Sequence, residues 1–465
     1  MKKLAILPLK YILLLNLFLK LVFFLMIAPW RSDVVSDTIL VSDSKGYHEL
    51  ALNILRNHSF APVKDTADVR SMSAVEASGF IFSRSDTFRT PGYPLFLAAV
   101  YWLFGERPWT ALLIQILLSL LTVVYVYKLS VLLFNTTQIA GLAALLFVLD
   151  IHSAYAANQL LTDTLFTFLF LSSVYFFLKG IYDKVSPFKM PGMGAFLLGL
   201  ACLTRPIAFL YLIVPLSLLL VLPGKGMPQK IRSAVFSALI FAGIVCCWTS
   251  RNYVKYGHWS FSTLQGHSMF LNMCLLKSKI EKQPLDASRT YFQAKADSMG
   301  FRATSDVFQQ AGIFEKVGIA YLMKHKLEYA KAHLMGAVNM FLSLGNRGMA
   351  NSFGWSRAKP GYEFAELNPA RISKNFNPDN VRETALGILI ALLLAIQYLG
   401  SFLGLIQLKK ERSTGVLLFF LLTILYFASL TGIVGMYRHK IPIVPLLCIL
   451  AGAGLSSLFR SPKQL

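Results

Sequence analysis

Long apolar runs separated by short basic loops constrain this chain more than any other feature. A helix needs about 20 mostly apolar residues to cross the roughly 30 Å of hydrocarbon in a bilayer. Hydrophobic residues make up 55% of the chain and charged residues 15%, whereas charged residues make up about a quarter of a soluble domain. We therefore expect an all-α integral membrane protein. The runs lie at about 4–29, 91–105, 109–134, 138–152, 158–180, 193–206, 207–222, 233–249, 384–407, 413–434 and 438–458.

The basic loops predict the topology. Short loops rich in Lys and Arg face the cytoplasm, so the four basic segments should lie on one side. An odd number of crossings is then needed between Trp30 and Lys179. Four apolar runs lie there, so one of them should not cross the membrane. The run 91–105 is short and opens with Pro91-Gly92-Tyr93-Pro94, and we interpret it as a helix lying on the outer surface. The basic segments are Lys2-Lys3, the loop with Lys179, Lys184 and Lys189, the loop with Lys225, Lys230 and Arg232, and Lys409-Lys410 with Arg412.

Pro206 is expected to divide the apolar stretch 193–222 into two short helices, because proline removes a backbone donor and restricts the residue before it. About ten transmembrane helices with a cytoplasmic N-terminus follow. Residues 1–260 form a transmembrane catalytic module with an external loop at 30–108. Residues 261–383 form an external region with surface helices, one of them within Ile313–Leu344, and residues 384–465 form the C-terminal transmembrane helices.

The net charge of +22 would suggest nucleic-acid binding in a soluble protein. Here Lys and Arg gather at the ends of apolar runs, without a basic and aromatic groove motif. The expected partners are therefore membrane lipids and phosphate-bearing substrates, not nucleic acid. The five cysteines show no C-x-x-C spacing and lie mostly inside apolar runs, which indicates small buried side chains rather than a zinc site.

Ionisable side chains at the edges of apolar spans are costly and point to function. On the predicted topology they converge on the outer face. Two carboxylates with several guanidinium groups suit a reaction in which a hydroxyl loses its proton and a phosphate leaves, since Arg offers paired donors to phosphate. The candidates are Asp43, Lys45, Tyr47, His48, Arg89, Asp163, Arg205, Arg251, Tyr437, Arg438 and Lys440.

Structural roles compete for the same residues. Asp43 could cap the helix that begins near Tyr47, and Asp163 could cap the span that follows it. Arg251 could be a flanking charge, and Arg438 with its basic neighbours could anchor the chain at the membrane interface.

Six short motifs follow one another along the chain: Asp43-x-x-x-Tyr47, Arg89-Thr90-Pro91-Gly92-Tyr93-Pro94, Leu160-Leu161-Thr162-Asp163, Leu203-Thr204-Arg205-Pro206, Trp248-x-x-Arg251-Asn252 and Tyr437-Arg438-x-x-x-Pro442. In this order they resemble the multi-span glycosyltransferases of the GT-C fold. The pattern is similar to that of the bacterial family-39 enzymes, which resemble protein O-mannosyltransferases and the aminoarabinose transferase of lipid A. The resemblance runs from about residue 1 to 270 and resumes near 430.

The resemblance implies a hexosyl- or pentosyltransferase that uses a polyprenyl-phosphate sugar donor and a lipid, glycan or protein acceptor. It implies a catalytic acid at Asp43 and a second acidic site at Asp163. A divalent cation, Mg or Mn, would have to bind through these two carboxylates, which are a thin oxygen shell. Many relatives carry an Asp-Glu pair where this chain reads Asp43-Ser44, so a metal-chelating pair does not carry over.

A transporter or flippase of a lipid-linked or anionic solute is the alternative. It would also place charges in a membrane cavity, but transporters usually show internal repeats, and none stands out here. A polysaccharide ligase is a further enzyme class, against which the Asp43 motif favours the transferase. The expected location is the cell membrane, or the inner membrane for a Gram-negative source.

Overall fold

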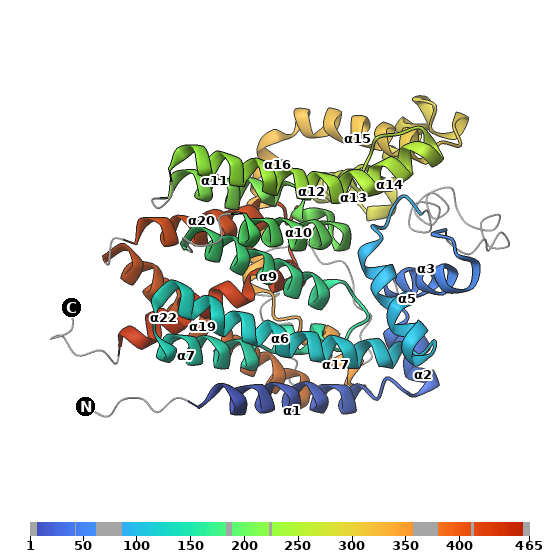
Figure 1. The fold of residues 1–465 in the computed structure, drawn as a ribbon. Helices are drawn as coiled ribbons and strands as arrows, with labels where there is room; N and C mark the ends of the chain where they lie inside the picture. The colour runs from blue at the N-terminus through green and yellow to red at the C-terminus, as the bar shows by residue number, and fades with distance from the viewer. Residues whose placement is uncertain are drawn as a thin grey trace.

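The computed structural model describes residues 7–41, 43–61, 86–182, 188–222, 226–356, 380–410 and 413–458. Every regular element within these ranges is helical. The long helices run alongside one another in a bundle, with further helices on one side and at one end (Figure 1). The expectation of an all-α membrane fold is confirmed.

Six helical stretches in the described ranges are long and apolar enough to cross a membrane. Five shorter apolar helices coincide with the remaining predicted runs. Their length alone does not show that they cross a membrane, so the count of about ten spans stays a prediction. The long stretches are α1 (Leu9–Ile27), α6 (Pro108–Phe134), α9 (Asp163–Tyr182), α12 (Met227–Tyr256), α19 (Val381–Lys410) and Tyr437–Ser457, which contains α21 (Tyr437–Lys440), η5 (Ile441–Ile443) and α22 (Val444–Ser457). The shorter ones are α5 (Gly92–Phe104), α7 (Thr137–Leu149), α10 (Lys189–Thr204), Pro206–Val221 and α20 (Thr414–Ser429).

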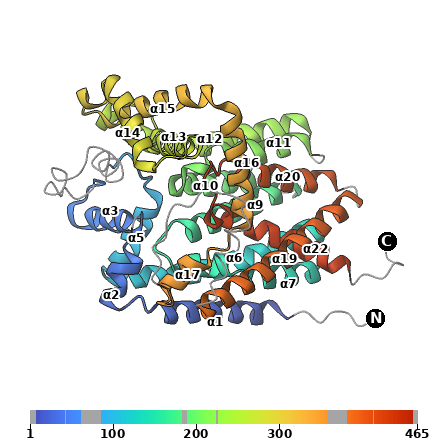
Figure 2. The same cartoon turned by 180° about the vertical axis from the view of Figure 1, so that it is seen from behind.

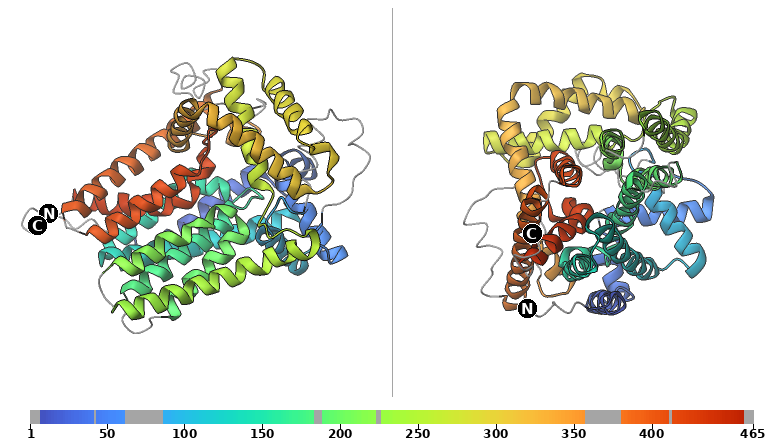
Figure 3. Two further views of the ribbon diagram at one scale, coloured as in Figure 1. Left: turned by 90° about the horizontal axis from the view of Figure 1, so that it is seen from above. Right: turned by 60° about the vertical axis from the view of Figure 1, so that its left-hand side comes forward.

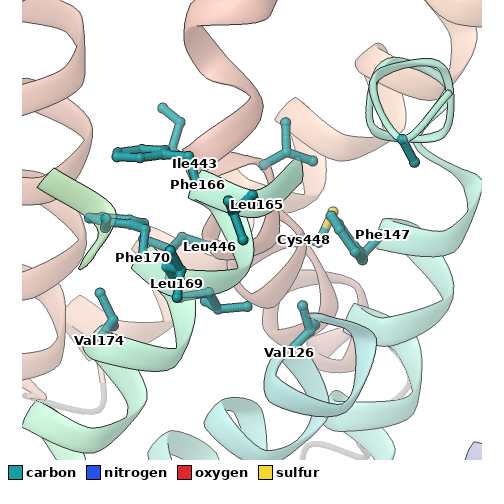
Figure 4. Close-up of a cluster of buried hydrophobic side chains, with 14 of the residues drawn as sticks. Val126, Phe147, Leu165, Phe166, Leu169, Phe170, Val174, Ile443, Leu446 and Cys448 are labelled. Atoms are coloured by element: carbon teal, nitrogen blue, oxygen red, sulfur yellow. The ribbon is translucent and has the colours of Figure 1, made fainter. Parts of the chain in front are cut away.

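Helix α22 lies at the centre of the bundle and packs against α19, α7 and α6. Glycines allow the close approach of α22 to α19: a Cβ atom at Gly404 would lie 2.2 Å from the carbonyl oxygen of Leu450. Small residues at such contacts are the usual means of helix association in a bilayer. Rings and aliphatic side chains such as Phe166, Phe170 and Leu446 fill the core around α22 (Figure 4).

The chain breaks at Pro206 as the sequence predicts. Helix α10 ends at Thr204, and Arg205 has extended backbone angles, with φ −144° and ψ 122°. The chain then passes through η2 (Pro206–Ala208) and η3 (Leu210–Leu212) into α11 (Ile213–Val221). An extended residue before proline is the expected conformation, because the proline ring crowds the preceding residue out of the helical region.

Helices outside the bundle form an outer layer with an apolar core of its own, built around Phe270, Phe292 and Phe314. Helices α13 to α15 gather on one side (Figure 3), and α16 runs from this layer back to the bundle, where it contacts α21 (Figure 2). The predicted surface segment Ile313–Leu344 thus contains two helices, which meet at His325. The bounds are α13 (Leu264–Glu281), α14 (Leu285–Ser298), η4 (Phe301–Ala303), α15 (Val307–Lys324) and α16 (Lys326–Leu342).

Short helices complete the end of the bundle where α3 and α5 lie. Helix α3 (Asp43–Asn57) packs against α5, which in turn contacts α6 and α10. The N-terminal end of α1 and the C-terminal end of α22 lie at the opposite end of the bundle (Figure 1). The remaining elements are α2 (Ser32–Val34), η1 (Val35–Ile39), α8 (Ile151–Ala156) and α17 (Asn346–Ser352).

The topology can be tested with single cysteines at the two ends of the bundle. Ser298 and Thr414 are both exposed, and Cys246 and Cys247, also exposed, are first replaced by alanine. Under the predicted topology, an impermeant maleimide labels Ser298→Cys in intact cells and labels Thr414→Cys only after permeabilisation. The reverse pattern would contradict the predicted orientation.

Candidate active site

A buried carboxylate bound by two arginines is the best-defined polar feature at this end of the bundle. Arg205 Nη1 lies 2.7 Å from Asp163 Oδ1. Arg438 reaches the other oxygen, with Nη2 at 2.8 Å and Nε at 3.3 Å from Oδ2. The Asp163 side chain is only 1% exposed, whereas those of Arg205 and Arg438 are 20% and 27% exposed. The cluster therefore carries one net positive charge, and its exposed part is formed by the two arginines.

Each of these three residues stands where a helix begins or breaks. Asp163 opens α9, and Arg205 is the extended residue between α10 and η2. Arg438 lies in the four-residue helix α21, which is followed by the turn η5 with Pro442. These helix ends and breaks bring together three charged residues that are distant in sequence.

A second ion pair lies at the start of α3. Arg89 Nη2 is 3.2 Å from Asp43 Oδ1, with Arg89 side chain 6% exposed and Asp43 side chain 49% exposed. Only Oδ1 is engaged in the described part of the chain, which leaves Oδ2 of Asp43 open. Asp43 is thus the accessible carboxylate of the two predicted acids, and Asp163 is the occupied one.

Tyr47 packs against the Arg89 guanidinium, whose central carbon lies 4.3 Å from the centre of the Tyr47 ring. Burial raises the pKa of the Tyr47 hydroxyl above its usual value, and Arg89, Asp43, Arg205 and Arg438 also act on it electrostatically. That both ion-pair clusters serve a single site stays a prediction.

Backbone contacts join the two clusters directly. The Thr90 hydroxyl donates to the Thr204 carbonyl at 3.2 Å. A Cβ atom at Gly92 would lie 2.7 Å from the backbone of Leu203 and Thr204, so only glycine fits this approach of α5 to α10. The motifs around Arg89 and Arg205 thus form one packed unit.

Other predicted site residues line the periphery. His48 Nδ1 lies 3.0 Å from the Tyr101 hydroxyl, and Lys45 is exposed near Glu49, 4.0 Å away. Tyr437 stacks on His152 with ring centroids 4.7 Å apart. Tyr437 is adjacent to Arg438, so it stays a candidate for contact with substrate.

Two predicted substrate-binding residues are engaged elsewhere. Lys440 is fully buried and donates to the Phe341 carbonyl at 3.1 Å and to the Tyr398 hydroxyl at 2.9 Å. This residue follows Arg438 by two positions in a helical turn, so its side chain points into the bundle instead of toward the site. Arg251 pairs with Asp86 and donates to the Phe60 carbonyl at 3.0 Å.

Asp86 is a buried charge that the sequence motifs did not single out as a site residue. Lys255 Nζ lies 2.7 Å from its Oδ2, and Arg251 and Tyr256 also donate to the carboxylate. Burial alone would raise the pKa of Asp86, but hydrogen bonds from Lys255, Tyr256 and Arg251 outweigh it and hold this pKa below its usual value. The cluster ties the segment before Arg89 to the end of α12.

The sequence motifs also did not single out Lys20, which lies inside α1. Lys20 is fully buried and donates to the Asn16 side chain at 2.5 Å, which in turn donates to Ser119 of α6 at 3.1 Å. A charge within the run 4–29 was the signal that could have revealed it. The bond from Asn16 to Ser119 joins α1 to α6.

The residues present do not fit a divalent cation bound through Asp43 and Asp163. Both oxygens of Asp163 are engaged by guanidinium groups. The described residues also contain no group of three or more His, Cys, Asp or Glu side chains placed to hold a metal ion. We derive no step through a metal.

Comparison with known structures identifies the architecture as the GT-C fold of membrane glycosyltransferases. The chain is similar to the archaeal oligosaccharyltransferase AglB of Archaeoglobus fulgidus in complex with an inhibitory peptide and a dolichol-phosphate, with TM-score 0.50 and 14% identity over 96% of this chain and 50% of that one. The same enzyme tethered to an acceptor peptide gives TM-score 0.53 and 13% identity over 97% and 50%. The chain thus spans about half the length of these relatives.

Residues 88–250 match the family described as dolichyl-phosphate-mannose-protein mannosyltransferase. This region contains Arg89, Asp163 and Arg205 and ends just before Arg251. ArnT of Cupriavidus metallidurans bound to undecaprenyl phosphate gives TM-score 0.40 and 13% identity over 96% of this chain and 78% of that one. No curated protein sequence matches the chain significantly.

Proposed function

We propose that the chain is a membrane glycosyltransferase that moves a sugar from a polyprenyl-phosphate donor to an acceptor hydroxyl on the non-cytoplasmic face. The observation that carries this proposal is that an accessible carboxylate, Asp43, and a partly exposed guanidinium pair, Arg205 and Arg438, belong to two ion-pair clusters that the contacts of Thr90 and Gly92 with residues 203 and 204 hold together. The family match at 88–250 and the GT-C fold support it, since both point to glycosyl transfer from lipid-linked donors.

The proposed reaction is a single inverting displacement. Asp43 Oδ2 accepts the proton of the acceptor hydroxyl, whose oxygen attacks the anomeric carbon. The bond between that carbon and the phosphate oxygen breaks, and the electron pair leaves with the polyprenyl phosphate. Arg205 and Arg438 stabilise the negative charge that grows on this oxygen, an effect that is strongest in a partly desolvated site.

Asp163 holds the two arginines in this mechanism and does not itself react. Its oxygens are engaged, but in these contacts between described residues Arg205 donates through Nη1, and Arg438 through Nε and Nη2. The remaining guanidinium N–H groups can donate to phosphate oxygens. A carboxylate that fixes both guanidinium planes would prepare the site for phosphate before the donor arrives.

Lysine replacements at the two arginines test phosphate binding. Arg438→Lys and Arg205→Lys keep the charge but lose the planar set of donors. Loss of one preorganised donor typically costs about a hundredfold to a thousandfold in rate, so we expect transfer from a synthetic polyprenyl-phosphate sugar to fall by that order. The measurement is initial rate at equal amounts of folded protein.

Arg107, an exposed arginine at the start of α6, provides the matched control, because Arg107→Lys should leave the rate unchanged. Wild-type rates in both Arg205→Lys and Arg438→Lys would return these residues to a structural role.

A further inference from the structure

The first turn of α3 presents three residues on one face. Asp43, Gly46 and Tyr47 follow the i, i+3, i+4 spacing, so they are neighbours on the helix surface. The guanidinium of Arg89 lies across this face. Its Nη2 is 3.2 Å from Asp43 Oδ1, and its central carbon is 4.3 Å from the centre of the Tyr47 ring.

Gly46 leaves the space that this guanidinium occupies. A Cβ atom at Gly46 would lie 2.8 Å from Nε, 3.0 Å from Nη2 and 3.2 Å from the central carbon of Arg89. A methyl group at position 46 would therefore require a shift of the Arg89 guanidinium, the planar end of a buried side chain that is paired with Asp43.

The position of Arg89 is energetically demanding. A cation at a helix N-terminus meets the positive end of the helix dipole, and this one is buried, with no hydrogen-bond partner for Nε among the residues that the structure describes. An unsatisfied buried donor is destabilising, whereas a desolvated cation over an aromatic ring is stabilised. The ion pair with Asp43 and the contact with Tyr47 therefore hold a guanidinium that the surroundings otherwise disfavour.

The segment that follows Arg89 is also constrained. Thr90 is bonded to Thr204, and Gly92 packs on the backbone of Leu203 and Thr204. Arg89 thus extends from a segment fixed against the residue that precedes Arg205. Its side chain therefore holds the carboxylate of Asp43 at a fixed place relative to Arg205 and Arg438, the proposed phosphate-binding pair.

We infer that Arg89 is a positioning residue that fixes the carboxylate of Asp43, with Gly46 as the residue that makes room for it, and that Arg89 is not a ligand of the donor phosphate. This inference rests on the proposed function, in which Asp43 is the general base. It replaces the sequence-based expectation that Arg89 binds phosphate with the other arginines.

Steady-state kinetics separate the two roles. For Gly46→Ala and Arg89→Lys we expect kcat to fall about tenfold or more, since a displaced base impairs proton transfer. We expect KM for a synthetic polyprenyl-phosphate sugar, and inhibition by free polyprenyl phosphate, to stay within about twofold of wild type, because the phosphate contacts are intact. A large rise in KM with weaker product inhibition would identify Arg89 as a phosphate ligand and overturn the inference.

The double variant Gly46→Ala, Arg89→Lys provides an independent readout. A flexible lysine can make room for the new methyl group, so the double variant should be no slower than Arg89→Lys alone, and the two effects should not add. Additive losses would show that Gly46 acts independently of Arg89. Gly312→Ala in α15, where a Cβ atom meets open space, is the matched control and should leave both constants unchanged.

Thermal unfolding in detergent is measured for each variant, and Arg89→Lys carries the test if Gly46→Ala does not fold. A wild-type protein that transfers no sugar would refute the proposed function. An active wild type with a fully active Gly46→Ala variant would refute only the positioning role of Arg89.

Discussion

Replacement of Asp43 by asparagine is expected to reduce sugar transfer about a hundredfold to ten-thousandfold, the usual loss when a general base is removed. Asparagine keeps the size of the side chain and an oxygen that can accept from Arg89, which lies 3.2 Å from Asp43 Oδ1. It cannot take the proton of the acceptor. Membrane insertion and donor binding should therefore be retained while transfer is lost.

The measurement is transfer from a synthetic polyprenyl-phosphate sugar at equal amounts of folded protein. Asp37→Asn is the matched control, because Asp37 is an exposed carboxylate in η1, six residues before Asp43. Transfer at the wild-type rate by Asp43→Asn would show that Asp43 has only a structural role in the first turn of α3. Asp86 would then be a poor substitute as base, since Arg251, Lys255 and Tyr256 all donate to it.

The same assay separates the transferase from the transporter. If neither wild type nor Asp43→Asn transfers sugar, but both move a lipid-linked substrate across a bilayer in reconstituted vesicles, the protein is a transporter or flippase. A transferase shows the opposite result, with a new glycosidic product in wild type alone.

Replacement of Asp163 by asparagine is expected to have the largest effect on stability. The carboxylate is 1% exposed and is the shared partner of Arg205 and Arg438. Removal of one partner from a buried ion pair costs about 3–5 kcal/mol, because a charge is left buried without compensation. The arginines here are partly exposed, so we expect a loss near the lower end of this range, together with loss of activity.

Unfolding in detergent micelles measures this effect. Asp33→Asn is the control, since Asp33 and Arg31 form an exposed ion pair whose loss should leave the unfolding midpoint unchanged. The triple variant Asp163→Leu, Arg205→Met, Arg438→Met removes all three charges, and it should regain stability without regaining activity. A stable Asp163→Asn variant would mean that the two arginines do not depend on this carboxylate.

Apolar periodicity predicted most of the bundle. Each predicted apolar run contains a helix, and the break at Pro206 lies where the proline rule put it. The signals were strong because a bilayer requires long apolar segments with every backbone group bonded within the helix. The outer layer was predicted less well, since amphipathic spacing over Ile313–Leu344 could not show that the chain bends at His325.

Sequence position and residue type also identified the principal charges. Asp43, Arg89, Asp163, Arg205 and Arg438 stood out because ionisable groups are rare at the edges of apolar runs. Their order along the chain and the parity of crossings predicted that they lie at one end of the bundle. In the structure Arg89 pairs with Asp43, and Arg205 and Arg438 pair with Asp163.

By itself, then, the sequence determined the class of fold and the end of the bundle where charge collects, because both depend on local hydrophobicity and on the number of crossings. Only the tertiary structure decided what each charge does. Asp163 and Asp43 are alike in sequence, yet one is enclosed by two guanidinium groups and the other is half exposed. Arg438 and Lys440 are two positions apart, but one faces the site and the other the core. Such differences arise from rotation about a helix axis and from contacts between residues hundreds of positions apart, neither of which a linear pattern of charges contains.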